Sequence, residues 1–222
     1  MNYRNDSVIF LQIPIPSTIL YFPFTDNETQ DLLGEELRLT SNGTGIFRWT
    51  AGVFYRSMDR HIVDAIPDFA FTQDLTLESD SYAGFGEATW SLLDRKLDVT
   101  LGLRYFKDDR LLTEVIDPAF LALIQSVDPT FTGKVDESFT TTNPRLNVAY
   151  HLADDWMAYG NIAKGFRTGQ PQPALSLGLA ILNGVTVPTG IDPETLWSYE
   201  VGTKGTFDDG HMTLEAAVYY NA

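Results

Sequence analysis

Histidines, paired carboxylates and one glycine triplet are the residues whose types and spacing could do chemistry. The histidines are far apart, without the i, i+4 spacing or cysteine partners of a zinc site, so they are interpreted as polar surface residues. The aspartate pairs lie at predicted strand ends, where turn formation and solvation explain them better than a calcium site does. The triplet lies in an alternating segment with no helix after it, unlike a phosphate-binding loop. We therefore expect no enzyme, metal site or cofactor from His61, His151, His211, Asp108-Asp109, Asp154-Asp155, Asp208-Asp209 and Gly84-Phe85-Gly86.

Composition narrows the class of protein further. The 222 residues carry 15 Lys plus Arg against 30 Asp plus Glu, and this net charge of −15 argues against nucleic acid as a partner. Cysteine is absent, so the sequence offers no disulfide framework and no thiolate metal site. Aromatic residues reach 13%, which fits a protein that places amphipathic rings at an interface.

Alternation of apolar and polar residues predicts about eight strands. Several are longer than ten residues, which exceeds the usual strand of a globular sheet and matches the length that crosses a bilayer at a tilt. The predicted strands cover residues 34–42, 46–57, 79–92, 96–109, 137–152, 155–167, 194–207 and 211–221.

The predicted connections alternate between short and long. Short turns fall at 41–45, 94–96, 153–155 and 208–210, where Gly, Asn or Asp allows tight geometry. Longer segments at 58–78, 110–136 and 168–193 are predicted loops, the second with a short helix at Asp117–Gln125. Outer-membrane barrels have short periplasmic turns and long extracellular loops. The fold prediction is therefore all-β: an antiparallel transmembrane β-barrel segment.

The alternation also predicts what each face contacts. Leu97, Val99, Leu101, Leu103 and Tyr105 would face lipid, while the polar residues between them would face a hydrated lumen. A one-residue slip would bring a lumenal arginine against lipid, at about 2–4 kcal/mol near the bilayer midplane. The four tryptophans lie near strand ends, where an aromatic girdle is expected: Trp49, Trp90, Trp156 and Trp197.

Three other interpretations account for part of the sequence. The apolar segment Val8–Phe24 contains three prolines, which argue against a membrane helix, and it lacks the features of a signal peptide. A soluble acidic β-sandwich acting as a binding module would need shorter strands and closer turns. A passive pore or small structural outer-membrane barrel of eight strands stays open as an alternative.

Four motifs, in this order along the chain, resemble the barrel of TonB-dependent outer-membrane receptors of the iron-siderophore type. They are EELRLTSNGTGIFRWTAGVFY at 35–55, GLRY at 102–105, AKGFRTG at 163–169 and SYEVGTKGTF at 198–207. The resemblance covers residues 35–222, a partial receptor barrel. Residues 1–34 have no clear assignment and are expected to be loop or strand upstream of it.

The resemblance implies a barrel of about 22 strands with a plug domain, and we expect this chain to be an internal piece without the plug. It further implies active uptake of a scarce nutrient, most often a ferric siderophore, across the outer membrane of a Gram-negative bacterium. The expected partners are outer-membrane lipid, the TonB energy-transducing complex and the nutrient.

Site residues follow from the same resemblance. Residues expected to line the lumen or contact the plug are Arg104, Arg145, Lys164, Arg167, Glu200 and Lys204. Glu200 and Lys204 are also explained as a charge ladder that keeps the interior hydrated. Phenylalanines of the long loops are expected to contact the ligand: Phe69, Phe71, Phe120 and Phe131.

Overall fold

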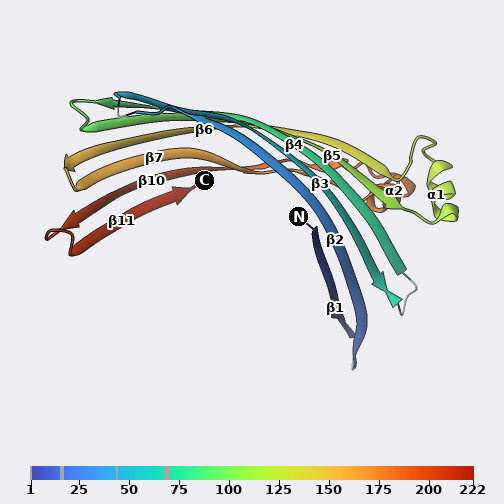
Figure 1. The fold of residues 1–222 in the computed structure, drawn as a ribbon. Helices are drawn as coiled ribbons and strands as arrows, with labels where there is room; N and C mark the ends of the chain where they lie inside the picture. Colours follow the sequence, from blue (N-terminus) through green and yellow to red (C-terminus); the bar gives the residue numbers. More distant parts are fainter. Residues whose placement is uncertain (1, 16–17, 44, 68–70) are drawn as a thin grey trace.

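Nine antiparallel strands lie side by side in one strongly curved sheet, seen in the computed structural model of residues 2–15, 18–43, 45–67 and 71–222 (Figure 1). The order in the sheet is β1-β2-β3-β4-β5-β6-β7-β10-β11, so neighbours in the sheet follow one another in the chain. The strands are β1 (Asn2–Ile15), β2 (Thr18–Thr40), β3 (Phe47–Ile66), β4 (Phe71–Leu92), β5 (Leu97–Val115), β6 (Lys134–Ala153), β7 (Trp156–Arg167), β10 (Glu194–Phe207) and β11 (Met212–Asn221).

This architecture confirms the all-β antiparallel prediction. Nine strands form rather than eight because residues 2–34 contribute β1 and much of β2. The sheet is open, since β1 pairs only with β2 and β11 only with β10. A β-sandwich would require a second packed sheet, and the described residues add only the two-residue pair of β8 (Gln170–Pro171) with β9 (Gly190–Ile191).

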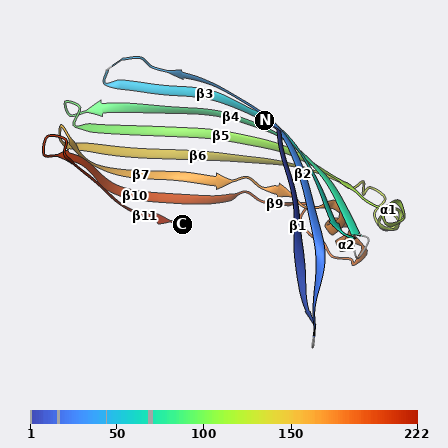
Figure 2. The same ribbon diagram turned by 60° about the horizontal axis from the view of Figure 1, so that its bottom comes forward.

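The short turns gather at one end of the sheet (Figure 2). They connect β2 to β3, β4 to β5, β6 to β7 and β10 to β11. Asp94, Asp208 and Asp209 have φ of 57°, 54° and 52° there, the left-handed geometry that Asp tolerates better than most residues. Acidic residues at these positions therefore serve as turn formers, as predicted. The same prediction is wrong for Asp108-Asp109, because β5 continues past them to Val115 and both are paired within the sheet.

The predicted loop at 58–78 is wrong. Pairing between β3 and β4 continues without a break from Phe47 opposite Trp90 to Ile66 opposite Phe71. Toward its end at Ile66, away from the short turns, β3 has polar residues such as Asp59 and His61 at positions where its first half has apolar ones. Alternation of apolar and polar residues therefore no longer marks a strand there. Hydrogen bonding to the neighbouring strand maintains the extended backbone, and β5 and β6 likewise extend to Val115 and from Lys134.

Long connections lie at the other end and contain two helices. The predicted helix is confirmed as α1 (Pro118–Gln125), where the Asp117 carboxylate accepts hydrogen bonds from the backbone N–H groups of Ala119 (2.9 Å) and Phe120 (3.2 Å). The second helix, α2 (Ala174–Leu182), was missed. Its N-cap is Pro173, without a capping side chain, so the sequence carries no start signal of the usual kind.

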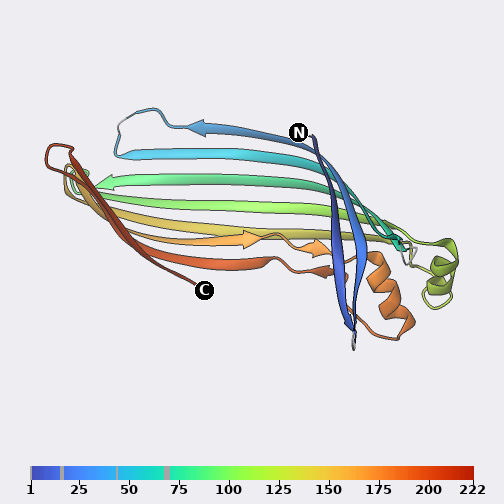
Figure 3. The ribbon, with the colours of Figure 1, turned by 90° about the horizontal axis from the view of Figure 1, so that it is seen from below.

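A small apolar core attaches these connections to the sheet. Leu112 of β5 and Val135 of β6 pack with Ala174 and Leu177 of α2. Figure 3 shows α2 and β9 at the same end of the sheet as the loop that carries α1. Residues 168–193 therefore form a packed segment, not a free loop.

Candidate functional site

The strand registers give the sheet two chemically different faces. One face, called the outer face, carries Leu101, Leu103 and Val201, which are 50%, 56% and 69% exposed. The opposite face, called the inner face, carries Arg104 and Arg145 and is covered at one end by residues 168–193. A continuous band of exposed apolar side chains across one face requires a non-aqueous surrounding.

Aromatic residues border the apolar band of the outer face. Phe47 and Trp90 pack at 5.3 Å near the short turns, and Tyr55 and Tyr82 at 5.2 Å farther along the same strands. The nine residues from Leu97 to Tyr105 on β5 fall within the roughly nine to eleven residues with which a tilted strand crosses a bilayer. Trp49, Trp90 and Trp156 lie at the short-turn end, whereas Trp197 lies near the start of β10.

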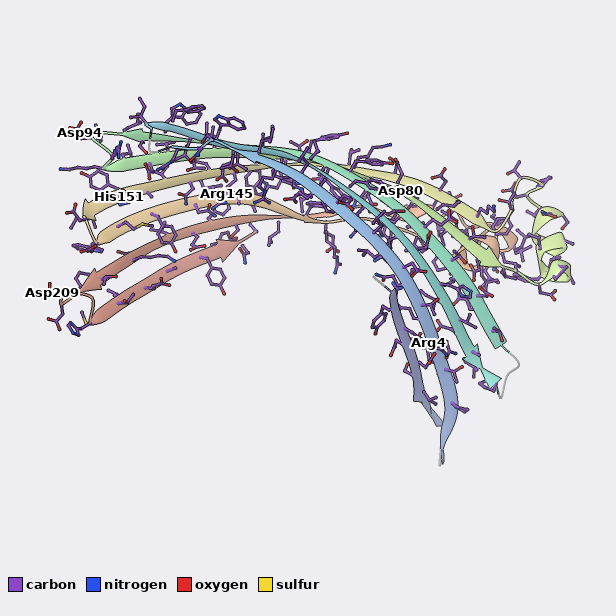
Figure 4. The ribbon with its side chains drawn as sticks, in the orientation of Figure 1. Arg4, Asp80, Asp94, Arg145, His151 and Asp209 are labelled. Atoms are coloured by element: carbon purple, nitrogen blue, oxygen red, sulfur yellow. The ribbon has the colours of Figure 1, made fainter. Side chains whose placement is uncertain are left out.

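Four of the six predicted lumenal residues, Arg104, Arg145, Glu200 and Lys204, lie on the inner face and border two adjoining hollows. Lys164 borders the first hollow too, although its register pairs it with Trp197, in line with the outer-face Val201. One hollow, of about 290 Å³, is lined by Arg104, Arg145 and Lys164. The second, of about 300 Å³, is lined by Arg145, Glu200 and Lys204, so Arg145 belongs to both. Figure 4 shows Arg145 partway along the sheet, away from Asp94 and Asp209 at the turns.

Charges in these hollows are partly paired. Arg145 Nη1 lies 3.5 Å from Glu87 Oε2, and its Nε donates to Asn161 Oδ1 at 3.1 Å. Glu200 Oε1 accepts a 2.5 Å hydrogen bond from the hydroxyl of Tyr159. The surface therefore offers both hydrogen-bond donors and acceptors to whatever fills the lumen.

Sequence reasoning missed the aromatic part of this surface. The Arg104 guanidinium lies over the rings of Phe54, Phe85 and Phe106 at 5.4, 5.7 and 6.0 Å. The Arg38 guanidinium also lies over the ring of Phe85, at 5.4 Å from its centroid. Such cation–π contacts hold the Arg104 side chain in place, whereas Arg38 also pairs with Glu36, at 2.6 Å from its Nη2 to Glu36 Oε1. Only the strand register, by bringing β2 to β5 together, indicates this cluster.

Arg167 lies apart from the hollows. Its Nη2 is 2.8 Å from Glu194 Oε2, and both side chains are more than half exposed. Pairs of this kind contribute little to stability. Arg167 is therefore separate from the hollows around Arg145, and its role in lining the lumen or contacting the plug stays a prediction.

The structure describes three of the four phenylalanines that are predicted to contact the ligand, and these three come from different segments of the chain. Phe131 lines a hollow of about 400 Å³ with Leu177 and Val185. Phe120 is in α1, and Phe71 is the first residue of β4, opposite Ile66. Phe69 lies outside the described residues.

Between the apolar band and the long connections, the inner face holds a buried charged network. On the outer face Lys107 and Asp109 follow Tyr105, so this part of β5 lies beyond the hydrocarbon layer. Asp108 is fully buried and accepts hydrogen bonds from Ser79 (2.7 Å), Ser81 (2.8 Å) and Arg110 Nε (2.7 Å). Burial raises the pKa of Asp108, but these hydrogen bonds and the Arg110 charge outweigh it and leave the pKa below 3.8.

None of the helices within 2–15, 18–43, 45–67 and 71–222 is long and apolar enough to span a membrane. The same residues hold no group of three or more His, Cys, Asp or Glu side chains arranged to bind a metal ion.

Long antiparallel strands with an apolar outer band, bordering aromatic rows and a charged inner face form the wall of a transmembrane β-barrel. Comparison with known families agrees. The family profile described as "TonB dependent receptor-like, beta-barrel" matches residues 2–222, so the chain belongs to this receptor family. The resemblance found in the sequence is confirmed, and the family is one of receptors, not of enzymes.

Solved structures of receptors share the fold. The ferric yersiniabactin uptake receptor FyuA from Yersinia pestis aligns with a TM-score of 0.62 at 19% identity, over 96% of this chain and 31% of that one. The unliganded ferric citrate transporter FecA gives 0.60 at 19%, over 98% and 30%. The ferric-catecholate import receptor Fiu from E. coli K12 gives 0.67 at 16%, over 99% and 37%. The chain thus spans about a third of the length of these receptors.

A glycine explains how Phe85 reaches its place, and this can be tested. A Cβ at Gly52 would lie 2.4 Å from Phe85 Cζ and 2.7 Å from the Leu37 carbonyl oxygen. We expect Gly52→Ala to lower the free energy of unfolding by about 1–3 kcal/mol, because the ring and the backbone must both move. Denaturant titration of the complete receptor in detergent measures the change.

Gly84→Ala is the matched control for this prediction. It lies on the paired strand, opposite Val53, and a Cβ there has no neighbour within 4 Å. Equal stability of the two variants would contradict the close packing of Phe85 on Gly52.

Proposed function

We propose that this chain forms about a third of the barrel of a receptor for active, TonB-dependent uptake of a ferric siderophore across the outer membrane of a Gram-negative bacterium. Residues 35–222, preceded by the strands of residues 2–34, would be part of its wall. The observation that carries the proposal is the division of the same strands into a lipid-type outer face and a charged inner face with hollows. The three receptors described above are each named for a ferric ligand, which favours iron.

The inner face supplies the contacts that such a receptor needs. Arg104, Arg145, Lys164, Glu200 and Lys204 would contact the plug domain, so that these polar contacts break when the TonB complex pulls on it. Arg167, which is exposed near the loop end, would meet the ligand or a neighbouring loop. Phe131 and the hollow beside it would contact apolar parts of the ligand, as would the predicted Phe69, Phe71 and Phe120.

The proposal is tested in the bacterium that encodes the complete receptor. Deletion of its gene is expected to abolish uptake of ⁵⁵Fe presented as one of a panel of siderophores, and the wild-type gene is expected to restore it. A protonophore should abolish the restored uptake, because TonB-dependent transport draws on the inner-membrane proton gradient.

Other results would point elsewhere. Uptake that survives the protonophore would indicate a passive pore. Unchanged uptake of every ferric siderophore, with loss of ⁶⁴Cu uptake, would indicate copper, the cargo named for the structurally similar copper transporter OprC (TM-score 0.62, 16% identity).

A further inference from the structure

Residues 168–193 connect β7 to β10 and are bound to the inner face by acidic side chains of β5 and β6. Thr168 Oγ1 donates to Asp108 Oδ2 at 3.0 Å, and the backbone N–H of Leu175 donates to Glu114 Oε2 at 2.7 Å. The Thr189 hydroxyl donates to Glu137. The start, the helix and the end of the segment are thus each attached to a different carboxylate.

Two of the three carboxylates, Asp108 and Glu114, are themselves held by side chains of the strands. Asp108 is fixed by Ser79, Ser81 and Arg110, and Glu114 accepts a second hydrogen bond from Gln73 Nε2 at 2.7 Å. Asp108 and Glu114 are 0% and 5% exposed. Because these acceptors are charged and shielded from water, their hydrogen bonds to the segment are stronger than hydrogen bonds at an exposed surface.

Apolar contacts complete the attachment. Leu177 and Ala174 of α2 pack on Leu112 and Val135. Gly178 brings α2 close to α1, since a Cβ there would lie 2.4 Å from Ile124 Cδ1. The segment is therefore docked on both its polar and its apolar side.

We propose that residues 168–193 are a permanently docked wall of the barrel mouth, and that Asp108, Glu114 and Glu137 are positioning residues that hold it there. The docked segment covers the inner face of β5 and β6. A ligand entering on this side therefore meets the surface of the segment itself. Residues 175–190 contain no charged side chain, and Leu179 and Val185 are 46% and 55% exposed. The surface offered is apolar, which suits an aliphatic or aromatic part of the ligand.

The role at the mouth rests on the proposed function, whereas the docking does not, so the test measures docking without any ligand. Hydrogen–deuterium exchange of the complete receptor in detergent is followed by mass spectrometry in peptides from residues 174–184. We expect Glu114→Ala and Thr168→Val each to speed exchange there by about tenfold, the loss expected for one charge-assisted hydrogen bond.

Matched controls separate docking from general damage. Asp109→Asn removes a carboxylate whose partner is the exposed Lys107, and Thr132→Val removes a hydroxyl that borders the 400 Å³ hollow. Both should leave exchange in residues 174–184 unchanged, and all four variants should leave exchange in residues 97–105 unchanged. Exchange of residues 174–184 in the wild type at the rate of an unstructured peptide, or equal exchange in test and control variants, would overturn the proposal. Loss of iron uptake with docking intact would concern the proposed function alone.

Discussion

Asp108→Asn should destabilise the complete receptor by about 3–5 kcal/mol, because it leaves the Arg110 guanidinium buried without its carboxylate partner. Arg110 Nε lies 2.7 Å from Asp108 Oδ2, and the Arg110 side chain is 8% exposed. Asparagine keeps the size of the side chain, so the loss reports the charge and its hydrogen bonds. Guanidinium unfolding at pH 7, followed by tryptophan fluorescence, measures it.

The adjacent residue is the control. Asp109 pairs with Lys107 at 2.7 Å on the outer face, and both side chains are about 40% exposed, at 39% and 43%. Asp109→Asn should change stability by less than about 1 kcal/mol, as for other exposed ion pairs. Similar effects of the two substitutions would show that the buried network does not stabilise the fold.

The stability that Asp108 contributes should also depend on pH. Its pKa in the folded protein lies below the ordinary 3.8, so the unfolded chain binds a proton first as the pH falls. The stability contributed by Asp108 is complete above about pH 3.8, and it declines as the pH falls through the lowered pKa of the folded state. The difference between wild type and Asp108→Asn should therefore shrink below pH 3.8 and stay constant near neutrality.

Leu101→Arg should destabilise the receptor in lipid vesicles by about 2–4 kcal/mol, because an arginine near the bilayer midplane must leave water. Leu101 is 50% exposed on the outer face, midway between the aromatic rows. Equilibrium refolding into vesicles over a guanidinium series measures the loss.

Asn147→Arg is the matched control on the inner face. Asn147 borders the same water-facing hollow as Glu200, whose carboxylate can pair with the new arginine. This change should therefore lower the stability of the receptor much less than Leu101→Arg does. Spin labels at Leu101 and Val201 should in addition be relaxed by oxygen, which dissolves in lipid, more than by a water-soluble nickel complex. Labels shielded from both would show that the outer face is buried in protein and that the membrane assignment is wrong.

The sequence predicted the strands well wherever one side of a strand faces lipid and the other side faces the hydrated interior. Around Leu97–Tyr105, apolar residues alternate with polar ones because one side meets lipid and the other a hydrated interior, and the predicted strand matches β5 there. The second half of β3, away from the short turns, meets water on the outer face. Its outward residues, such as Asp59, therefore give no alternation, and the continuation of the strand beyond residue 57 was missed. α2 was missed for a related reason, since neither a capping side chain nor a polar face marks it.

Part of the candidate site could likewise be predicted from the sequence, and part could not. Strand parity alone assigned Arg104, Arg145, Glu200 and Lys204 to one face, because side chains in a strand alternate with a period of two. Parity carries no information on distance across the sheet or on loops. That Arg167 pairs with Glu194, away from the hollows around Arg145, was therefore decided by the tertiary structure.

By itself, the amino-acid sequence determined that this protein is a wall of long strands with a lipid-facing and a water-facing side, since burial in lipid acts on every second residue. Only the tertiary structure decided that Arg104 lies among three phenyl rings and that residues 168–193 are docked on buried carboxylates. Contacts of this kind join residues as far as 61 positions apart. They depend on strand register and on the path of a loop, which local patterns do not encode.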